Sequence, residues 1–102
     1  MESYTEVDGV PNVANRRTLN QLLRQELKFD GMLVTDYHEI FNLFEFHHTA
    51  KDRTDAIHQS LSEGSVDMSM IALEPEDYFR AFESLPQEEF QDRIRSSARR
   101  VL

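Results

Sequence analysis

The sequence has no cysteine and no tryptophan, and its three glycines are isolated from one another. The absence of cysteine excludes disulfide frameworks and thiolate metal sites. Isolated glycines exclude the glycine-rich loop that cradles phosphate groups. No apolar run approaches the roughly 20 residues that cross a bilayer, so no membrane segment is expected. What is left is one small domain of 102 residues, 39% of them hydrophobic.

Basic residues are scarce as well. There are 11 lysines and arginines against 19 acidic residues, a formal net charge of -8. A surface this negative repels phosphate backbones, so a nucleic acid partner is not expected. The first ten residues, "MESYTEVDGV", lack a basic region followed by an apolar core, so no signal peptide is expected and the chain carries no address of its own.

The four histidines do not form a metal-binding pattern. His47 and His48 are adjacent and therefore point in different directions, while His38 and His58 fall on separate predicted elements. The HExxH arrangement of zinc proteases is absent. We expect neither a bound metal nor a cofactor.

Hydrophobic periodicity predicts three strands and five helices. Alternation at period two and flanking turn residues indicate the strands, and apolar spacing of three and four indicates the helices. Pro75 and Pro86 each suit a first helical turn, and Gly64 suits a helix end. The predicted strands span residues 3–7, 32–35 and 65–72, and the predicted helices span residues 16–27, 38–46, 51–63, 75–85 and 86–101.

The order of these elements predicts an α/β fold. Strands that alternate with helices favour parallel pairing through right-handed crossovers. Three parallel strands make a small sheet with two exposed edges, whereas parallel sheets are normally covered on both faces. The sheet is therefore either marginal or short of strands.

The stretch "GMLVTDYHEI" places Asp36 directly after the second predicted strand. Functional side chains in parallel α/β folds gather at the carboxyl ends of strands. Tyr37 follows Asp36, and Tyr4 falls near the end of the first predicted strand. A carboxylate between aromatic rings suits a sugar site, because the carboxylate attacks or stabilises an anomeric carbon and the rings cover the C–H faces of the sugar. The alternative is that Asp36 caps the following helix.

The residues also resemble a known family. The segments "SYTEVDGVPNVAN", "LLRQELKFDGMLVTDYHEI", "EGSVDMSM" and "RIRSSARRVL" occur in the order of motifs found in family 3 glycoside hydrolases, the β-glucosidase and exo-β-glucanase group. The resemblance covers essentially all 102 residues. It implies that residues 1–102 are a fragment of the family's N-terminal catalytic barrel domain.

The resemblance implies roles for particular residues. Asp36 matches the family's catalytic nucleophile. Tyr37, where tryptophan is common, matches a position that flanks the bound sugar, and Tyr4 matches a tyrosine beside the nucleophile. Met70 matches a position near the substrate pocket. Asn15 and Asp67 belong to the motifs, and structural roles are expected for both.

The family's first domain resembles a (β/α)8 TIM-type barrel of about 250 residues. This chain would supply three parallel strands, barrel strands six to eight, with their flanking helices. The strands that grip the sugar hydroxyls and the usual acid/base residue would be absent. Among residues of this chain, Glu39 suits the start of a helix through the helix dipole, and Glu6 is an outside candidate for the second carboxyl group.

The implied function is that of a retaining β-glucosidase, which releases β-D-glucose from the non-reducing ends of β-glucosides or β-glucans. Family members are often secreted or lysosomal. We expect the isolated chain to be an inactive piece. The alternatives are a noncatalytic barrel fragment, which pairs with a complementing barrel chain or with itself through exposed strand edges, and an ordinary α/β binding domain.

Overall fold

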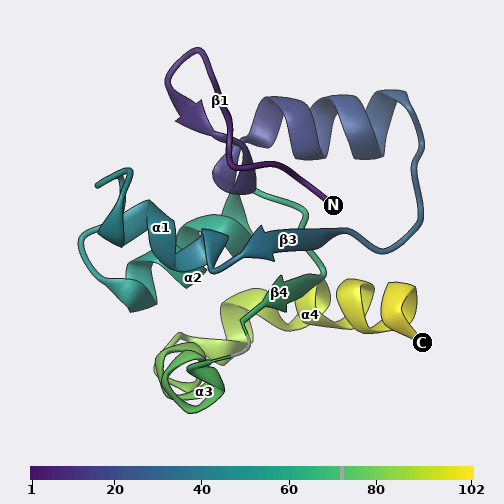
Figure 1. The fold of residues 1–102 in the computed structure, drawn as a ribbon. Coiled ribbons are helices and arrows are strands. Elements are labelled where there is room, and N and C mark those ends of the chain that lie inside the picture. Colours follow the sequence, from purple (N-terminus) through teal and green to yellow (C-terminus); the bar gives the residue numbers. More distant parts are fainter. Residues whose placement is uncertain (72) are drawn as a thin grey trace.

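A computed structural model describes residues 1–71 and 73–102 (Figure 1). The elements follow the α/β order predicted from the sequence. They are β1 (Glu6–Val7), β2 (Val10–Pro11), η1 (Asn12–Ala14), η2 (Arg16–Glu26), β3 (Val34–Tyr37), α1 (Glu39–Glu45), α2 (Arg53–Ser62), β4 (Met68–Met70), α3 (Pro75–Glu83) and α4 (Gln87–Val101). None of the described helices is long and apolar enough to cross a membrane.

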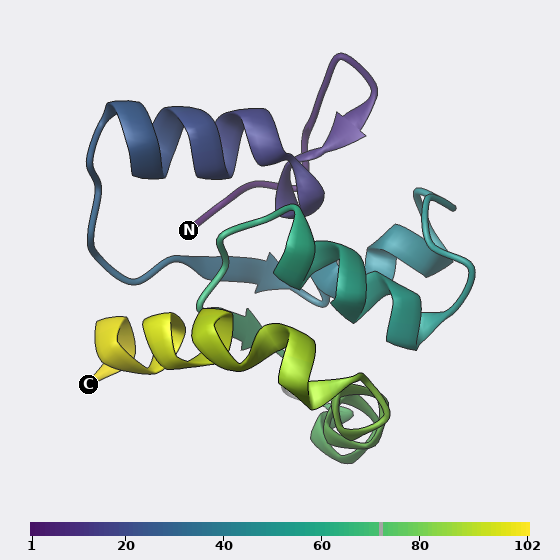
Figure 2. The ribbon, with the colours of Figure 1, turned by 180° about the vertical axis from the view of Figure 1, so that it is seen from behind.

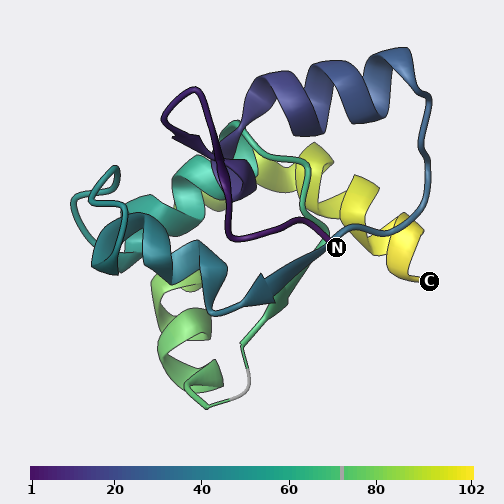
Figure 3. The same cartoon turned by 45° about the horizontal axis from the view of Figure 1, so that its top comes forward.

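The central feature is a parallel pair of strands, β3 and β4. Val34 is opposite Met68, and Tyr37 is opposite Met70. The two strands lie side by side; α4 passes in front of β4 in the rear view (Figure 2), and η2 and α4 lie on the same side of the pair in the tilted view (Figure 3). The predicted third strand ends at Ala72, which lies outside the described residues.

The prediction of three parallel strands is wrong for the described residues, which form two. The predicted strand over residues 3–7 instead becomes a short antiparallel hairpin of β1 and β2. Asp8 and Gly9 have φ values of 53° and 77°, which suit the tight two-residue turn that joins such hairpins. The hairpin projects away from the parallel pair (Figure 3). The backbone that precedes the hairpin reaches β3, where the Glu2 N–H donates to the Val34 carbonyl at 3.1 Å.

The helix η2 begins where the sequence predicts but is wound more widely than an α-helix. The Asn15 side chain caps it by accepting a hydrogen bond from the Thr18 N–H at 3.2 Å, a structural role of the kind expected for Asn15. The Leu27 N–H donates to the Leu22 carbonyl five residues earlier. Because hydrogen bonds that span five residues change the number of residues per turn, the leucines of this segment do not share one face: Leu19 is buried, whereas Leu22 and Leu27 are exposed.

The core lies between the parallel strands and the helices α1 and α2. Phe41, Leu43 and Ile57 are fully buried there. Gly64 ends α2 as predicted and lies so close to η1 that a Cβ atom would clash with the carbonyl oxygens of Val13 and Ser60. The packing therefore requires glycine at this position.

Asp67, just before β4, joins four parts of the chain. Its side chain is fully buried. It accepts hydrogen bonds from the Leu33 N–H at 2.9 Å and from the Ser97 hydroxyl at 2.7 Å. Arg24 of η2 and Arg100 of α4 pair with it at 2.8 and 2.9 Å. All these contacts are internal, in agreement with the structural role expected for Asp67.

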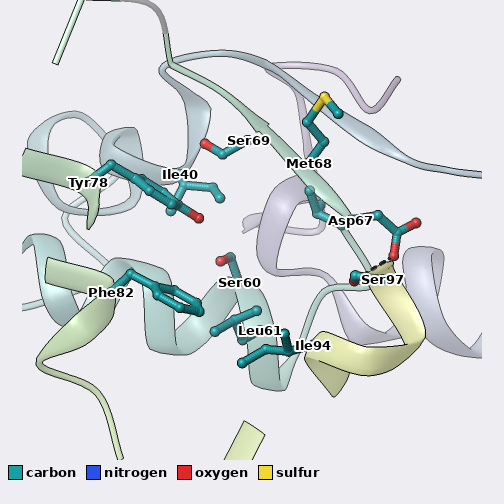
Figure 4. A pocket seen from close by; sticks show the side chains of 11 residues that line it. Ile40, Ser60, Leu61, Asp67, Met68, Ser69, Tyr78, Phe82, Ile94 and Ser97 are labelled. Carbon is teal, nitrogen blue, oxygen red and sulfur yellow. Dashed lines mark hydrogen bonds between the residues drawn. The ribbon is translucent and has the colours of Figure 1, made fainter. Parts of the chain in front are cut away.

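A cavity of about 150 Å³ lies between β4 and the helices α2, α3 and α4 (Figure 4). Tyr78 and Phe82 of α3 line it, together with Ser60 of α2. Burial raises the pKa of the Tyr78 hydroxyl. Asp36 is not among its lining residues, so this cavity is part of the helix packing and separate from the end of β3.

Candidate functional site

Asp36 lies near the carboxyl end of β3, one residue before the strand ends. Its backbone N–H donates to Glu2 Oε1 at 3.0 Å, and its own Oδ1 accepts from the Tyr37 N–H at 2.7 Å. The side chain does not cap α1, because the strand runs two residues further than predicted. The residue that precedes α1 is His38, which makes no side-chain cap bond. Helix capping therefore does not account for Asp36.

The structure brings Tyr4, Tyr37 and Met70 together around the end of β3. The Tyr4 hydroxyl donates to the backbone carbonyl of Tyr37. Tyr37 is opposite Met70 in the parallel pair, and the Met70 carbonyl accepts from the His38 N–H at 2.9 Å. All three side chains are between 37% and 46% exposed, so each keeps a face open to a ligand.

The negative charge of Asp36 affects the pKa of the Tyr4 hydroxyl. Partial desolvation and the carboxylate of Asp36 together raise the pKa of the Tyr4 hydroxyl. The phenol therefore stays protonated and able to donate a hydrogen bond at neutral pH. A charged carboxylate and a phenol O–H side by side can stabilise positive charge on a sugar ring and hold a sugar oxygen.

Two further carboxyl groups, which the sequence interpretation misses as parts of the site, lie beneath Asp36. Glu2 is 7% exposed and Glu39 is fully buried. Burial, with the charges of Glu39 and Asp36 added, raises the pKa of Glu2 to about 7. Burial also raises the pKa of Glu39, against the Asn42 hydrogen bond and the nearby His47 ring, which lower it. No local pattern signals this burial, because the surrounding residues come from separate elements.

An open hollow of about 480 Å³ lies beside the two tyrosines. Tyr4 and Tyr37 form part of its wall, whereas Asp36 and Met70 do not line it. Three charged residues also line the hollow: Arg53 pairs there with Glu45 at 2.7 Å and with Glu74 at 3.1 Å. The hollow thus combines aromatic faces with fixed charged groups, a composition that suits a polar ligand with apolar faces.

Within residues 1–71 and 73–102, no group of three or more His, Asp or Glu side chains is arranged to hold a metal ion. His47 instead lies between Glu6 and Glu39, and His58 pairs with Glu89 at 3.2 Å.

Glu2 should make folding stability depend on pH. Its folded pKa of about 7 lies above the ordinary value of 4.5, so the folded chain binds more protons between these pH values. Stability therefore falls as the pH rises through this range, by as much as about 3 kcal/mol if Glu2 acts alone. Glu2→Gln should flatten the decline. Urea unfolding from pH 4.5 to above pH 7 measures it.

The control for this prediction is Glu83→Gln, at an exposed position on α3. This variant should follow the wild-type curve. A Glu2→Gln curve that runs parallel to the wild-type curve over the whole range would show that Glu2 does not cause the pH dependence.

Fold and site together define the class: a parallel α/β unit with a carboxylate and two tyrosines at the carboxyl end of a strand. Comparison with known proteins identifies the family. All of residues 1–102 match the Glycosyl hydrolase family 3 N terminal domain. The chain therefore belongs to glycoside hydrolase family 3, as the sequence motifs indicate.

Two curated proteins are similar in sequence. The chain is 46% identical over 69 residues to "Lysosomal beta glucosidase" of Dictyostelium discoideum, which covers 68% of this chain and 8% of that protein. It is 37% identical over 71 residues to "Beta-xylosidase" of Formosa agariphila, which covers 70% of this chain and 10% of that protein. The chain thus spans a small part of the length of these relatives.

Solved structures show the same fold. A β-glucosidase from Erythrobacter marinus matches 97% of this chain and 13% of its own, with a TM-score of 0.83 and 26% identity. A β-glucosidase from Listeria innocua, in complex with isofagomine, matches 96% of this chain and 13% of its own, with a TM-score of 0.80 and 26% identity. The fold is therefore that of a segment of these larger glucosidases.

Proposed function

We propose that this chain is a piece of a catalytic barrel, contributing barrel strands six to eight, in a retaining β-glucosidase. In this proposal Asp36 is the nucleophile, and Tyr4, Tyr37 and Met70 contact the sugar. The observation that carries the proposal is the position of Asp36: a half-buried carboxylate at the carboxyl end of a parallel strand, beside two half-exposed tyrosines.

The chemistry follows from the carboxylate. Asp36 attacks the anomeric carbon as the glycosidic oxygen leaves, and a covalent glycosyl ester forms. Water then attacks the same carbon, releases the sugar with retained configuration and frees the carboxylate. The leaving oxygen takes a proton from a second carboxyl group about 5–5.5 Å from the nucleophile. In this proposal that group comes from outside residues 1–102.

The proposed substrate is a β-glucoside or β-glucan. The relative with the higher identity is named as a β-glucosidase, and both solved structures are named as β-glucosidases. The second curated relative is named as a β-xylosidase, so an aryl β-xyloside belongs in every assay as a competing substrate.

The test is a chimera, which we call the barrel transplant, in which residues 1–102 replace the matching segment of the Erythrobacter marinus β-glucosidase. The TM-score of 0.83 supports this exchange. We expect the transplant to hydrolyse an activated aryl β-glucoside and to retain configuration, which proton NMR of the first product reads directly. We expect no turnover from the 102-residue chain alone, because the second carboxyl group is missing.

Two outcomes would contradict the proposal. A transplant that folds, judged by circular dichroism and cooperative melting, but produces the inverted sugar would exclude a nucleophilic role for Asp36. Turnover by the isolated chain that disappears in Asp36→Ala would show that the second carboxyl group lies within this chain after all.

A second candidate function is a noncatalytic module that pairs through its exposed surface. An apolar groove of about 350 Å³ between η2 and the lead into β3 favours it, with Leu22, Leu27 and Phe29 on its wall. All three side chains are at least 43% exposed. Gel filtration discriminates the two: self-association that Leu27→Glu abolishes supports the module, and a monomer at every concentration argues against pairing with itself.

A further inference from the structure

The His47 side chain is buried between two carboxyl groups. Only 3% of the side chain is exposed, although His47 lies in a loop that follows α1. Its Nδ1 is 2.8 Å from Glu6 Oε1 of the β1–β2 hairpin. Its Nε2 is 3.5 Å from Glu39 Oε1, at the start of α1. The ring therefore joins the hairpin to the first residue of the helix that follows Asp36.

A proton is needed between each ring nitrogen of His47 and the carboxyl oxygen that faces it. A carboxylate only accepts hydrogen bonds, and a neutral imidazole has one N–H and one bare nitrogen. A single proton on the ring would leave one bare nitrogen facing a carboxylate, lone pair to lone pair. One extra proton must then occupy the Glu6–His47–Glu39 row, either on the ring or on a carboxyl group.

The buried end of the row is where that proton is needed most. Glu39 is fully buried, and its Oε1 has no hydrogen-bond partner within the described residues. Its Oε2 already accepts from the Asn42 amide at 3.1 Å. The Glu6 side chain, in contrast, is 46% exposed, so water solvates its charge. Leaving a carboxylate oxygen buried and unpaired costs several kcal/mol in an apolar interior, as an order of magnitude.

The row also borders the site. The charges that face it are Glu6 from the hairpin and Glu39 from α1, with Asp36 of β3 and Glu2 beyond Glu39. Burial raises the pKa of both Glu39 and Glu2; the negative charge of Asp36 adds to the shift of Glu39, and the charge of Glu39 adds to that of Glu2. A proton held in the row therefore removes one negative charge from the surroundings of Asp36.

We propose that Glu39 and His47 hold one shared proton, exchanged with solvent through Glu6, and that this pair positions the strand end that carries Asp36. Glu39 and His47 are thus positioning residues rather than catalytic residues. Their effect on hydrolysis depends on the proposed function of Asp36, whereas the shared proton itself does not.

The test follows the protons by NMR in the 102-residue chain, with ¹⁵N shifts for the imidazoles and ¹³C shifts for the carboxyl groups. We expect the Glu39 carboxyl and the His47 ring to report the same macroscopic midpoints, because the titration steps of coupled groups belong to the pair. In Glu39→Gln the side-chain amide can donate to the bare ring nitrogen. The His47 ring should then bind its second proton at least about tenfold more weakly.

The matched control is the exposed pair of His58 and Glu89, whose side chains are 38% and 51% exposed. Glu89→Gln should change proton binding by the His58 ring less than about threefold, because water screens an exposed pair. If Glu39→Gln fails to fold, the titration of the wild-type chain still decides whether Glu39 and His47 share a proton. Separate midpoints for Glu39 and His47 in the wild-type chain would overturn the proposal.

In the barrel transplant, Glu39→Gln should shift the pH profile of kcat/KM and Glu89→Gln should leave it unchanged. A purely structural role of Glu39 would lower activity at every pH alike. If the folded transplant shows no turnover but the midpoints coincide, the proposed function fails and the shared proton is retained. If the transplant is active but the midpoints differ, only the shared proton is refuted.

Discussion

In the barrel transplant, Asp36→Asn is expected to lower kcat on an aryl β-glucoside by at least about 10³-fold, since removal of a covalent nucleophile has effects of this size or larger. Asparagine has nearly the same shape and its amide oxygen can still accept from the Tyr37 N–H, a bond that is 2.7 Å long in the native chain. It cannot form the glycosyl ester. Steady-state kinetics should therefore show a loss in kcat without a comparable loss of fold.

A smaller variant separates a nucleophile from a proton donor. Asp36→Gly opens space at the anomeric carbon, and added azide can then take the place of the missing carboxylate. The expected product is the α-glucosyl azide, because azide attacks from the side that Asp36 occupied. A β-glucosyl azide would place Asp36 on the side of the leaving group instead, as a general acid/base.

The control for the loss of activity is Asp30→Asn. The Asp30 side chain is 97% exposed, and its Arg100 partner lies 3.7 Å away. This variant should keep kcat within about twofold, because an exposed ion pair contributes little. Equal kcat values for Asp36→Asn and Asp30→Asn would refute the proposed role of Asp36.

Asp67→Ala is expected to destabilise the chain by about 3–5 kcal/mol, the effect of removing one partner of a buried ion pair. The loss leaves Arg24, Arg93 and Arg100 facing one another without their shared carboxylate. It also leaves the Leu33 N–H without its acceptor. Since small domains are stable by only about 5–15 kcal/mol, this change removes a large part of the free energy of unfolding, which urea titration measures.

The same carboxylate predicts the behaviour in acid. Burial by itself would raise the pKa of Asp67, but the hydrogen bonds of Leu33, Ser97 and Arg100 more than offset it and hold the pKa below its ordinary value of 3.8. The stabilising contribution is present above that value and is lost as the pH falls through the folded pKa. The wild-type chain should lose stability in this acidic range, and Asp67→Ala should lack that part of the decline.

Asp92→Ala serves as the surface control. Asp92 is on α4, its side chain is fully exposed, and it pairs with Arg95 at 3.4 Å. Its removal should change the free energy of unfolding by less than about 1 kcal/mol. If the two alanine variants unfold at similar urea concentrations, the contacts of Asp67 do not contribute the predicted free energy of unfolding.

Local sequence patterns predict the existence of the helices and of the strands β3 and β4. Ala56, Ile57 and Ser60 are spaced for one face of a helix, and all three are buried. The boundaries are less certain, as β3 shows: the strand is predicted over residues 32–35 and observed over Val34–Tyr37. The Leu33 N–H donates to the Asp67 side chain instead of to a strand partner, and no local pattern encodes that long-range bond.

For the site, the order of motifs predicts four residues: Asp36, Tyr4, Tyr37 and Met70. Their roles in catalysis and sugar binding stay predictions. The sequence interpretation misses Glu2 and places Glu39 at a helix dipole, whereas the structure buries both. It also treats His47 only as one of two adjacent histidines. The bond from the Asp36 N–H to Glu2 spans 34 residues, and the His47–Glu6 contact spans 41. Contacts at such separations are invisible to a local pattern.

The sequence by itself determines the family, the helical segments and the identity of the acidic residue at the end of a strand, because motifs and periodicities are local properties. Only the tertiary structure decides that the first predicted strand folds into a hairpin. It also decides that Asp67 joins three arginines and that Glu2, Glu39 and His47 are enclosed beside Asp36. The physical reason is that burial and charge depend on which distant segments surround a side chain, and folding alone brings those segments together.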